Sequence, residues 1–260
     1  MNIINYFRFR SNLTISFLCT LTVGCTLMSH NSNAQEILRL PNFTLKQVQP
    51  AVDKGSPESF YILATLYYKG LNGVGLNYQK SAELFRRAAE QGIALAQLHL
   101  GEMYYEGTKI PQNDSEALRW YQVAALQGLP QAEYGLANIY AEGHGTTRNL
   151  TEAARWYKRA AIQGYGLAQH QTGINYANGT GVNIDPVNAY KWLSLASSKG
   201  VMESIGSRDD MRKSMTKDQL ATAQRNASMF TSLPHYNTNE LKCQKTKIID
   251  LAKEIKKNNK

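Results

Sequence analysis

The side chains best suited to catalysis are few, and one short motif stands out. Ser214-Met215-Thr216-Lys217 matches S-x-x-K, the nucleophile motif of penicillin-recognising enzymes. The KTG and SDN elements that accompany this motif in those enzymes are missing, and a pattern with two fixed positions arises easily by chance. The histidines show no HExxH spacing, and the chain has neither a P-loop nor a GxSxG motif. We therefore predict no catalytic residue and a protein that is not an enzyme, with a peptidoglycan- or β-lactam-related enzyme as a remote alternative.

The cysteines do not predict a metal site or an internal disulfide. The chain has three of them, Cys19, Cys25 and Cys243, with no CxxC or Cys/His spacing of the kind that binds zinc. If the first 34 residues are removed, Cys243 remains as a single thiol, and whether it pairs with another chain stays open. We predict no metal and no cofactor.

The first 34 residues have the three parts of an export signal. Arg8 and Arg10 form a basic start, residues 13–28 are free of charge and mostly apolar, and Ser32-Asn33-Ala34 precedes a cleavage point before Gln35. This pattern predicts a cleaved signal peptide over 1–34 and a periplasmic or secreted protein. Two alternatives stay open: acylation at Cys25 of a lipobox-like stretch (21–25), which would make an envelope lipoprotein, and an uncleaved anchor.

The net charge of +9 gathers at the two ends of the chain. Residues 1–34 and 35–200 each carry +2, residues 201–230 carry +1, and residues 231–260 carry +4. A nearly neutral body does not support nucleic-acid binding. The apolar runs are also too short for a polytopic membrane protein.

The middle of the chain is an internal repeat. The dipeptides Lys54-Gly55, Gln91-Gly92, Gln127-Gly128, Gln163-Gly164 and Lys199-Gly200 are spaced 37, 36, 36 and 36 residues apart. Other residues recur at matching offsets: Tyr67, Tyr104, Tyr140 and Tyr176; Gly70, Gly107, Gly143 and Gly179; Trp120, Trp156 and Trp192. Such a period is typical of stacked repeats and is the main determinant of the fold.

One unit is predicted to be a pair of helices. Small and apolar residues in 94–106 fall on one helical face, and Gly107 ends that helix because glycine tolerates positive φ. Asp114 or Ser115 is expected to cap a second helix, which ends at Gln127-Gly128. Because one such pair cannot bury its apolar face alone, the units are expected to stack into a solenoid.

These units resemble the Sel1-like repeat family, relatives of the tetratricopeptide repeat. The matching stretches include AQLHLGEMYYEG, DSEALRWYQVAALQG and AEYGLANIYAEGHGTTRNLTEAARWYKRAAIQG. The resemblance covers about 58–230 and implies an all-α, right-handed α/α solenoid of four repeats, 58–92, 93–128, 129–164 and 165–200. Residues 35–57 and 201–230 would supply helical caps. Members of this family typically serve as non-enzymatic adaptors, so the resemblance implies a scaffold that binds a protein or peptide partner.

The tetratricopeptide analogy also implies where the partner would bind. First-helix positions that point away from the core would line a concave groove. The candidates are Tyr61, Tyr68, Glu102, Tyr105, Glu106, Tyr134, Asn138 and Glu142, with Thr65, Leu98, His170, Ile174 and Asn178 beside them. Tyrosine gives rigid contact area, and the carboxylates favour a partner that carries lysine or arginine.

Residues 231–260 form a lysine-rich tail. Leu241, Ile248, Ile249, Leu251, Ala252 and Ile255 would give a short helix a modest apolar stripe. We expect a loosely docked helix with a solvated lysine face. A weak contact of 242–260 to a polyanion or membrane surface is the alternative. The oligomeric state and the identity of the partner are not predicted.

Overall fold

The computed structural model describes residues 44–231 and 238–257, and within those ranges it is all-helical. The predicted signal peptide, the Cys25 lipobox and the first part of the predicted N-terminal cap lie outside the described residues. None of the described helices is both long enough and apolar enough to cross a bilayer.

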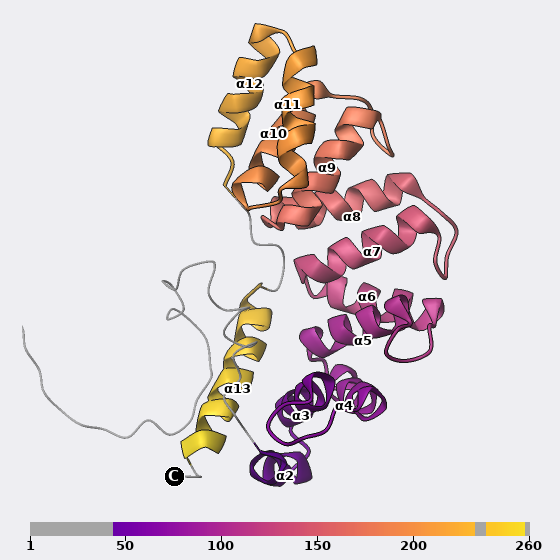
Figure 1. The fold of residues 1–260 in the computed structure, drawn as a ribbon, viewed down its shortest axis with the longest axis vertical. Coiled ribbons are helices and arrows are strands. Elements are labelled where there is room, and N and C mark those ends of the chain that lie inside the picture. The colour runs from indigo at the N-terminus through magenta and orange to yellow at the C-terminus, as the bar shows by residue number, and fades with distance from the viewer. Residues whose placement is uncertain (1–43, 232–237, 258–260) are drawn as a thin grey trace, which may run out of the picture.

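Eight of the helices form four antiparallel pairs, one pair for each predicted repeat. They are α3 (Pro57–Lys69) with α4 (Tyr78–Glu90), α5 (Ala94–Glu106) with α6 (Asp114–Leu126), α7 (Pro130–Glu142) with α8 (Leu150–Ile162), and α9 (Gly166–Asn178) with α10 (Pro186–Ser198). Each helix packs against the next one along the chain, and the pairs follow an arc (Figure 1). The predicted α-solenoid is confirmed.

Glycine closes the first helix of every repeat, as the sequence predicts. Gly107 is the C-cap of α5 with φ 64°, and Gly70, Gly143 and Gly179 stand at the same place with φ between 62° and 86°. A side chain with a Cβ is strained in this left-handed region, which explains why the repeat places glycine there.

The cap of the second helix lies one residue earlier than predicted. Neither Asp114 nor Ser115 is the N-cap of α6; that position belongs to Asn113, whose side chain accepts a hydrogen bond from the backbone N–H of Glu116 at 3.1 Å. Asn77, Asn149 and Asp185 cap α4, α8 and α10 in the same way. Because either asparagine or aspartate fills an extended N-cap well, the dipeptide Asn113-Asp114 left two choices in the sequence.

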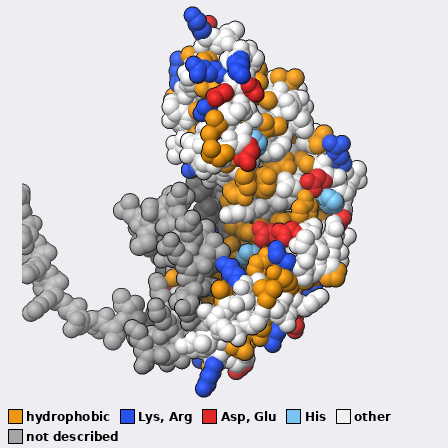
Figure 2. Space-filling view, in the orientation of Figure 1, with side chains coloured by type: hydrophobic (Ala, Val, Ile, Leu, Met, Phe, Trp, Pro, Cys, Tyr) orange, Lys and Arg blue, Asp and Glu red, His pale blue; other side chains and the backbone are white. Residues whose placement is uncertain are grey.

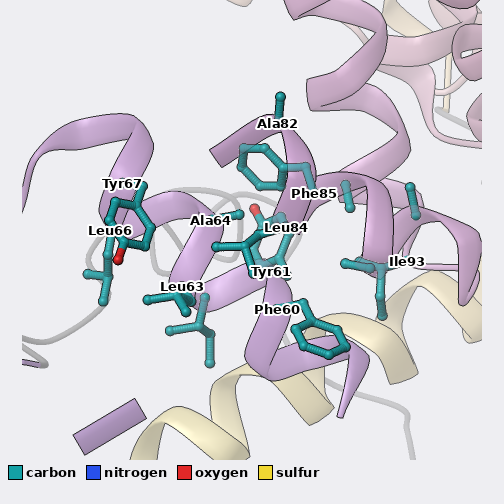
Figure 3. Close-up of a cluster of buried hydrophobic side chains, with 14 of the residues drawn as sticks. Phe60, Tyr61, Leu63, Ala64, Leu66, Tyr67, Ala82, Leu84, Phe85 and Ile93 are labelled. Carbon is teal, nitrogen blue, oxygen red and sulfur yellow. The ribbon is translucent and has the colours of Figure 1, made fainter. Parts of the chain in front are cut away.

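Alanine pairs let the second helices approach their neighbours closely. Ala88-Ala89, Ala124-Ala125 and Ala160-Ala161 are all buried, and Trp120 and Trp192 fill the space beside them. In the first repeat the core consists of Phe60, Tyr61 and other large side chains of α3 and α4 (Figure 3). The buried apolar residues form four clusters, and partly buried tyrosines such as Tyr104 and Tyr134 each pack against two of them.

Further helices lie at the two ends of the stack. At the beginning stands α2 (Leu45–Asp53), which Thr44 caps, and at the end stand α11 (Glu203–Ser214) and α12 (Lys217–Ser228). Thr216 forms a capping box with Gln219 at the start of α12, and that helix ends two residues before Phe230.

The tail helix α13 (Thr238–Lys257) does not stay beside α12. It lies on the inner side of the arc, at the opposite end of the stack, in contact with α3 and α2 (Figure 1). Cys243 is exposed on this helix.

Candidate binding groove

The inner side of the arc is hollowed and carries apolar and acidic side chains together. Figure 2 shows hydrophobic side chains and a group of Asp and Glu side chains gathered in this hollow, over the middle repeats. The first helices α5 and α7 supply most of the residues predicted for the groove. The structure separates these residues into an accessible group and a buried group.

Tyr61 belongs to the buried group, which corrects the prediction that it lines the groove. Only 3% of its surface is exposed, because His99 stacks on its ring with centroids 6.0 Å apart and Phe85 lies on another side at 5.7 Å. Its hydroxyl lies 3.4 Å from His99 Nε2, and the other ring nitrogen of His99 lies 3.1 Å from Glu102. This aromatic contact joins the first repeat to the second. It offers no tyrosine face to a partner.

Two neighbours of Tyr61 in the predicted set are also buried. Thr65 donates its hydroxyl to the carbonyl of Tyr61 at 2.9 Å, and Leu98 is 6% exposed. In the fourth repeat, His170 is half-buried and its Nδ1 lies 2.9 Å from the hydroxyl of Ser204 on α11, so the C-terminal cap reaches this end of the groove.

Tyr105 is the centre of the accessible group. Its hydroxyl donates a hydrogen bond to the carboxylate of Glu142, one repeat further along the chain. The ring of His144 meets the ring of Tyr105 edge-on with centroids 5.6 Å apart, and His144 Nε2 lies 3.3 Å from Glu142. The other nitrogen of His144 lies 3.3 Å from Asp114, at the start of α6. One tyrosine, one histidine and two carboxylates thus connect the second and third repeats.

Three tyrosines adjoin this group. The ring of Tyr134 lies 5.5 Å from the rings of both Tyr157 and Tyr165, and the hydroxyl of Tyr157 donates to Asn138 at 2.6 Å. Tyr134 and Tyr165 are half-buried, so each keeps part of its ring at the surface. We call Glu102, Tyr105, Tyr134, Glu142, His144 and Tyr165 the Tyr–Glu cluster.

The phenols of this cluster stay protonated at neutral pH. Burial, together with the carboxylate of Glu142, raises the pKa of Tyr105, and burial likewise raises the pKa of Tyr134 and Tyr165. Their hydroxyls are therefore neutral hydrogen-bond donors rather than charged groups.

The carboxylates of the cluster have no permanent cation beside them. Within the described residues, the ion pairs of Glu102, Glu142 and Asp114 are all made with histidine, which is charged only when it is protonated. Glu106 differs, because Lys109 lies 2.7 Å from its carboxylate. The same lysine lies 5.1 Å from the centre of the Tyr68 ring, so Glu106 and Tyr68 are engaged within the chain. The available negative charge is therefore that of Glu102 and Glu142.

Sequence reasoning missed two members of the Tyr–Glu cluster, His144 and Tyr165, and the buried tyrosine that packs on Tyr134, Tyr157. His144 lies in the loop between α7 and α8, Tyr157 on the second helix α8, and Tyr165 at the turn before α9. The tetratricopeptide analogy directs attention to first helices alone. Tyr165 occupies the N-cap position that Ile93 and Leu129 fill in earlier repeats, and this departure from the repeat was a usable signal.

The two residues of the S-x-x-K motif, Ser214 and Lys217, lie on different helices and are both exposed. Ser214 is exposed and donates its hydroxyl to the carbonyl of Met211 in its own helix at 2.8 Å. Lys217 opens the next helix and is exposed as well. In the described part of the chain, no group of three or more His, Cys, Asp or Glu side chains is placed to hold a metal ion.

Comparison with known proteins agrees with this architecture. The family model "Sel1 repeat" matches four consecutive segments, 57–93, 94–129, 130–165 and 166–201. Each predicted repeat boundary lies within one residue of these limits. No curated protein matches the chain.

Two solved structures are similar in both sequence and fold. One is c5321, a protective antigen present in uropathogenic Escherichia coli strains, with an SLR fold. It has 31% identity and a TM-score of 0.65, over 70% of this chain but only 39% of its own length. The other is a Sel1 repeat protein from Oxalobacter formigenes, with 32% identity and a TM-score of 0.58, over 69% of this chain and 76% of its own.

Proposed function

The chain belongs to the Sel1 repeat family, whose members are generally scaffolds for protein–protein interaction, and from this premise we propose that its Tyr–Glu cluster binds a partner protein. The ligand would be an extended segment that carries lysine or arginine. The protein would act as an adaptor without catalysis of its own.

The observation that supports this proposal is the pairing of accessible tyrosine rings with carboxylates that have no lysine or arginine ion-pair partner among the described residues. Tyr105 and Tyr134 come from successive first helices, and Glu142 lies beside Tyr105. A cationic side chain could approach a ring face and a carboxylate at once, which combines cation–π and ionic attraction. Such a site favours one charge sign in its ligand.

The electrostatic part of this binding is expected to set specificity and association rate more than affinity. Charges at a groove surface are screened by salt, with a Debye length of about 8 Å at physiological ionic strength. The tyrosines are expected to carry most of the affinity, because aromatic anchors dominate binding energy at protein interfaces. Salt and mutation should therefore separate the two contributions.

A selection from a random peptide library on phage tests the proposal. The purified chain is the bait, and the enriched peptides should contain lysine or arginine. Binding of one selected peptide is then measured against Tyr105→Ala and against the double variant Glu102→Gln, Glu142→Gln. We expect each to weaken binding at least about tenfold, equivalent to about 1.4 kcal/mol.

A matched control replaces two exposed carboxylates of α4, Glu83→Gln and Glu90→Gln, which change the net charge equally outside the groove. This variant should bind the peptide as the wild-type chain does. Equal loss in both double variants would mean that only net charge matters, and selected peptides without any cation would refute the predicted ligand chemistry.

We also propose that the protein works outside the cytoplasm, on the basis of the sequence of residues 1–34. Mass spectrometry of the chain from its native cell would decide the form of the mature protein. A mature N-terminus at Gln35 supports a cleaved signal peptide, and a diacylglyceryl modification of Cys25 supports the lipoprotein alternative. An intact Met1 with no modification would leave only the uncleaved anchor.

A further inference from the structure

The first helix of the first repeat carries apolar side chains at two positions that are polar or glycine in the later repeats. Phe60 stands where the later repeats have Gln97, Glu133 and Gln169, and Ile62 stands where they have His99, Gly135 and Gln171. Every residue of α3 from Ser59 to Tyr67 is buried. A helix that is buried all round needs neighbours on every side, and α4 and α5 cover only part of it.

The cap helix α2 is not enough to cover the remaining surface of α3. It has nine residues, and Val48 is its only buried one. The remaining cover comes from α13, whose Ile248 and Ala252 lie in the same apolar cluster as Val48 and Phe60. Figure 3 shows the pale ribbon of α13 passing close to Phe60. The end of the solenoid is thus completed by a helix from the far end of the chain.

Gln244 fixes the position of α13 by hydrogen bonds to the turn between α4 and α5. Its Nε2 donates to the carbonyl of Gly92 at 3.0 Å, and its Oε1 accepts from the backbone N–H of Ala94 at 3.1 Å. The same Nε2 also lies 3.2 Å from the side-chain oxygen of Gln127. The side-chain amide of Gln244 is thus hydrogen-bonded to one backbone acceptor, Gly92, and to one backbone donor, Ala94, of the same turn.

These contacts lie on one stripe of the helix. Gln244, Ile248 and Ala252 are spaced by four residues, which places them above one another on one face. Cys243 and Lys247 are exposed beside this stripe. Among the side chains of α13 that the structure describes, Ile248 and Ala252 are buried, and Ile249 and Leu251 are partly buried against the same cluster. The contact is specific in its register but small.

We propose that α13 is a tethered, removable ligand and that its seat on α2, α3 and the α4–α5 turn is a second binding surface. The surface takes an amphipathic helix with glutamine, isoleucine and alanine at intervals of four residues. The occupant in this structure is the chain's own α13. Tethering raises its effective concentration, so a small contact suffices to keep it seated. This inference does not depend on the Tyr–Glu cluster.

The test uses a fluorescent peptide of residues 238–257 and the full-length chain. In the wild-type chain α13 should fill the seat, and in the variant Ile248→Asn the seat should be vacant. We expect the peptide to bind the Ile248→Asn chain at least tenfold more tightly than the wild-type chain. The variant Lys247→Ala changes an exposed neighbour and should bind the peptide as weakly as wild type.

A second peptide, carrying Ile248→Asn itself, controls for charge because its lysines are unchanged. It should bind neither chain. Equal binding of the unmodified peptide to both chains would overturn the proposal, since the peptide would then bind elsewhere. Failure of the unmodified peptide to bind either chain would overturn it as well. If Ile248→Asn abolishes cooperative unfolding, then α13 is a fixed part of the fold and the proposal is wrong.

The variant Gln244→Ala removes the hydrogen bonds of α13 but keeps its apolar stripe, so α13 should leave its binding surface less completely than in Ile248→Asn. It should also bind the peptide more tightly than wild type does, by a smaller factor. Sedimentation of the wild-type chain distinguishes α13 seated in its own chain from α13 exchanged between two copies. We expect a monomer, and a dimer would overturn the assignment of α13 to its own chain.

Discussion

Amide side chains at the helix ends form a repeating contact that the repeat pattern alone does not reveal. In the second repeat Gln97 is buried, donates to the carbonyl of Ala89 at 3.0 Å and accepts from Gln127 at 2.7 Å. The dipeptide Gln127-Gly128 recurs along the sequence, but this recurrence predicts only that a helix ends there. The bond from Gln127 to Gln97 was not predictable, because it depends on two side chains 30 residues apart that meet only in the folded repeat.

The fourth repeat has this contact half-formed. Gln169 donates to the carbonyl of Ala161 at 3.1 Å as Gln97 does to Ala89, but its buried oxygen has no hydrogen-bond partner in the described structure. Lys199 occupies the position of Gln127. We expect Lys199→Gln to supply the missing donor and to raise the free energy of unfolding by about 0.5–1.5 kcal/mol. Urea unfolding measures the change.

Lys199→Ala is the matched control, since it removes the same lysine without adding a donor. It should leave the free energy of unfolding close to that of wild type. An equal gain in both variants would assign the effect to the loss of the lysine and refute the amide contact.

Glu133 replaces the buried glutamine in the third repeat. It is fully buried beside Arg159 at 3.1 Å and Gln163 at 2.7 Å. Burial raises its pKa to about 7, although Arg159 and Gln163 oppose that shift. At weakly acidic pH, Glu133 is therefore still protonated in the folded chain but already ionised in the unfolded chain. Its contribution to stability is full at low pH and is lost as the pH rises through about 7.

Glu133→Gln should remove this dependence and introduce the residue type of the second and fourth repeats. At pH 8 we expect the variant to be more stable than wild type, by up to about 3 kcal/mol at 1.36 kcal/mol per pKa unit. At pH 5 the difference should shrink. Urea unfolding from pH 5 to pH 8 tests this, and parallel curves for the two chains would contradict it.

At the scale of helices, the repeat pattern predicted the elements well because it is carried by local signals. Glycine at the end of the first helix has the same physical role in all four units, and the alanine pair of the second helix recurs in the first three, so the helix pairs follow from them. The groove was harder to predict. Tyr61 and Tyr134 stand at equivalent positions, yet Tyr61 is buried and Tyr134 is half-buried. Part of the cover on Tyr61 comes from His99 of the following repeat, which the pattern of one unit does not contain.

Close packing between successive helices can be tested at Gly135. A Cβ built on this residue would lie within 3.0 Å of three ring atoms of Tyr121 in the preceding repeat, closer than real Cβ contacts come. Gly135→Ala should therefore destabilise the chain by about 1–3 kcal/mol through overpacking. Tyr121→Leu should relieve the clash in the double variant, because the fourth repeat has Leu193 at that position. Thermal unfolding of the two single variants and the double variant measures this coupling.

Gly206→Ala provides the comparison, because Gly206 lies inside α11 with no atom within 4 Å of its built Cβ. The substitution should stabilise the chain by about 0.5–1 kcal/mol through helix propensity. If Gly135→Ala were equally stabilising, the close approach of Tyr121 would be refuted.

At the scale of the whole molecule, the solenoid is one-dimensional except at α13. The main contacts of the other helices are with helices one or two positions away along the chain, so a local defect should spread only to adjacent repeats. The tail helix is the exception, since it contacts α2 and α3 although it follows α12. The sequence predicted a docked tail helix but not its site, because the apolar stripe alone does not specify which end of the stack receives it.

Trp192 tests this one-dimensional behaviour. It is 3% exposed on α10, and its ring lies 5.2 Å from that of Phe230, just after α12. Trp192→Ala should lower the stability of the last repeat and its cap by about 3–5 kcal/mol. Hydrogen exchange should then accelerate in α9 to α12 and remain unchanged in α3 to α6. A uniform acceleration would show a single cooperative unit. Acceleration in α2 and α3 together with α12 would instead show that α13 transmits the defect between the ends.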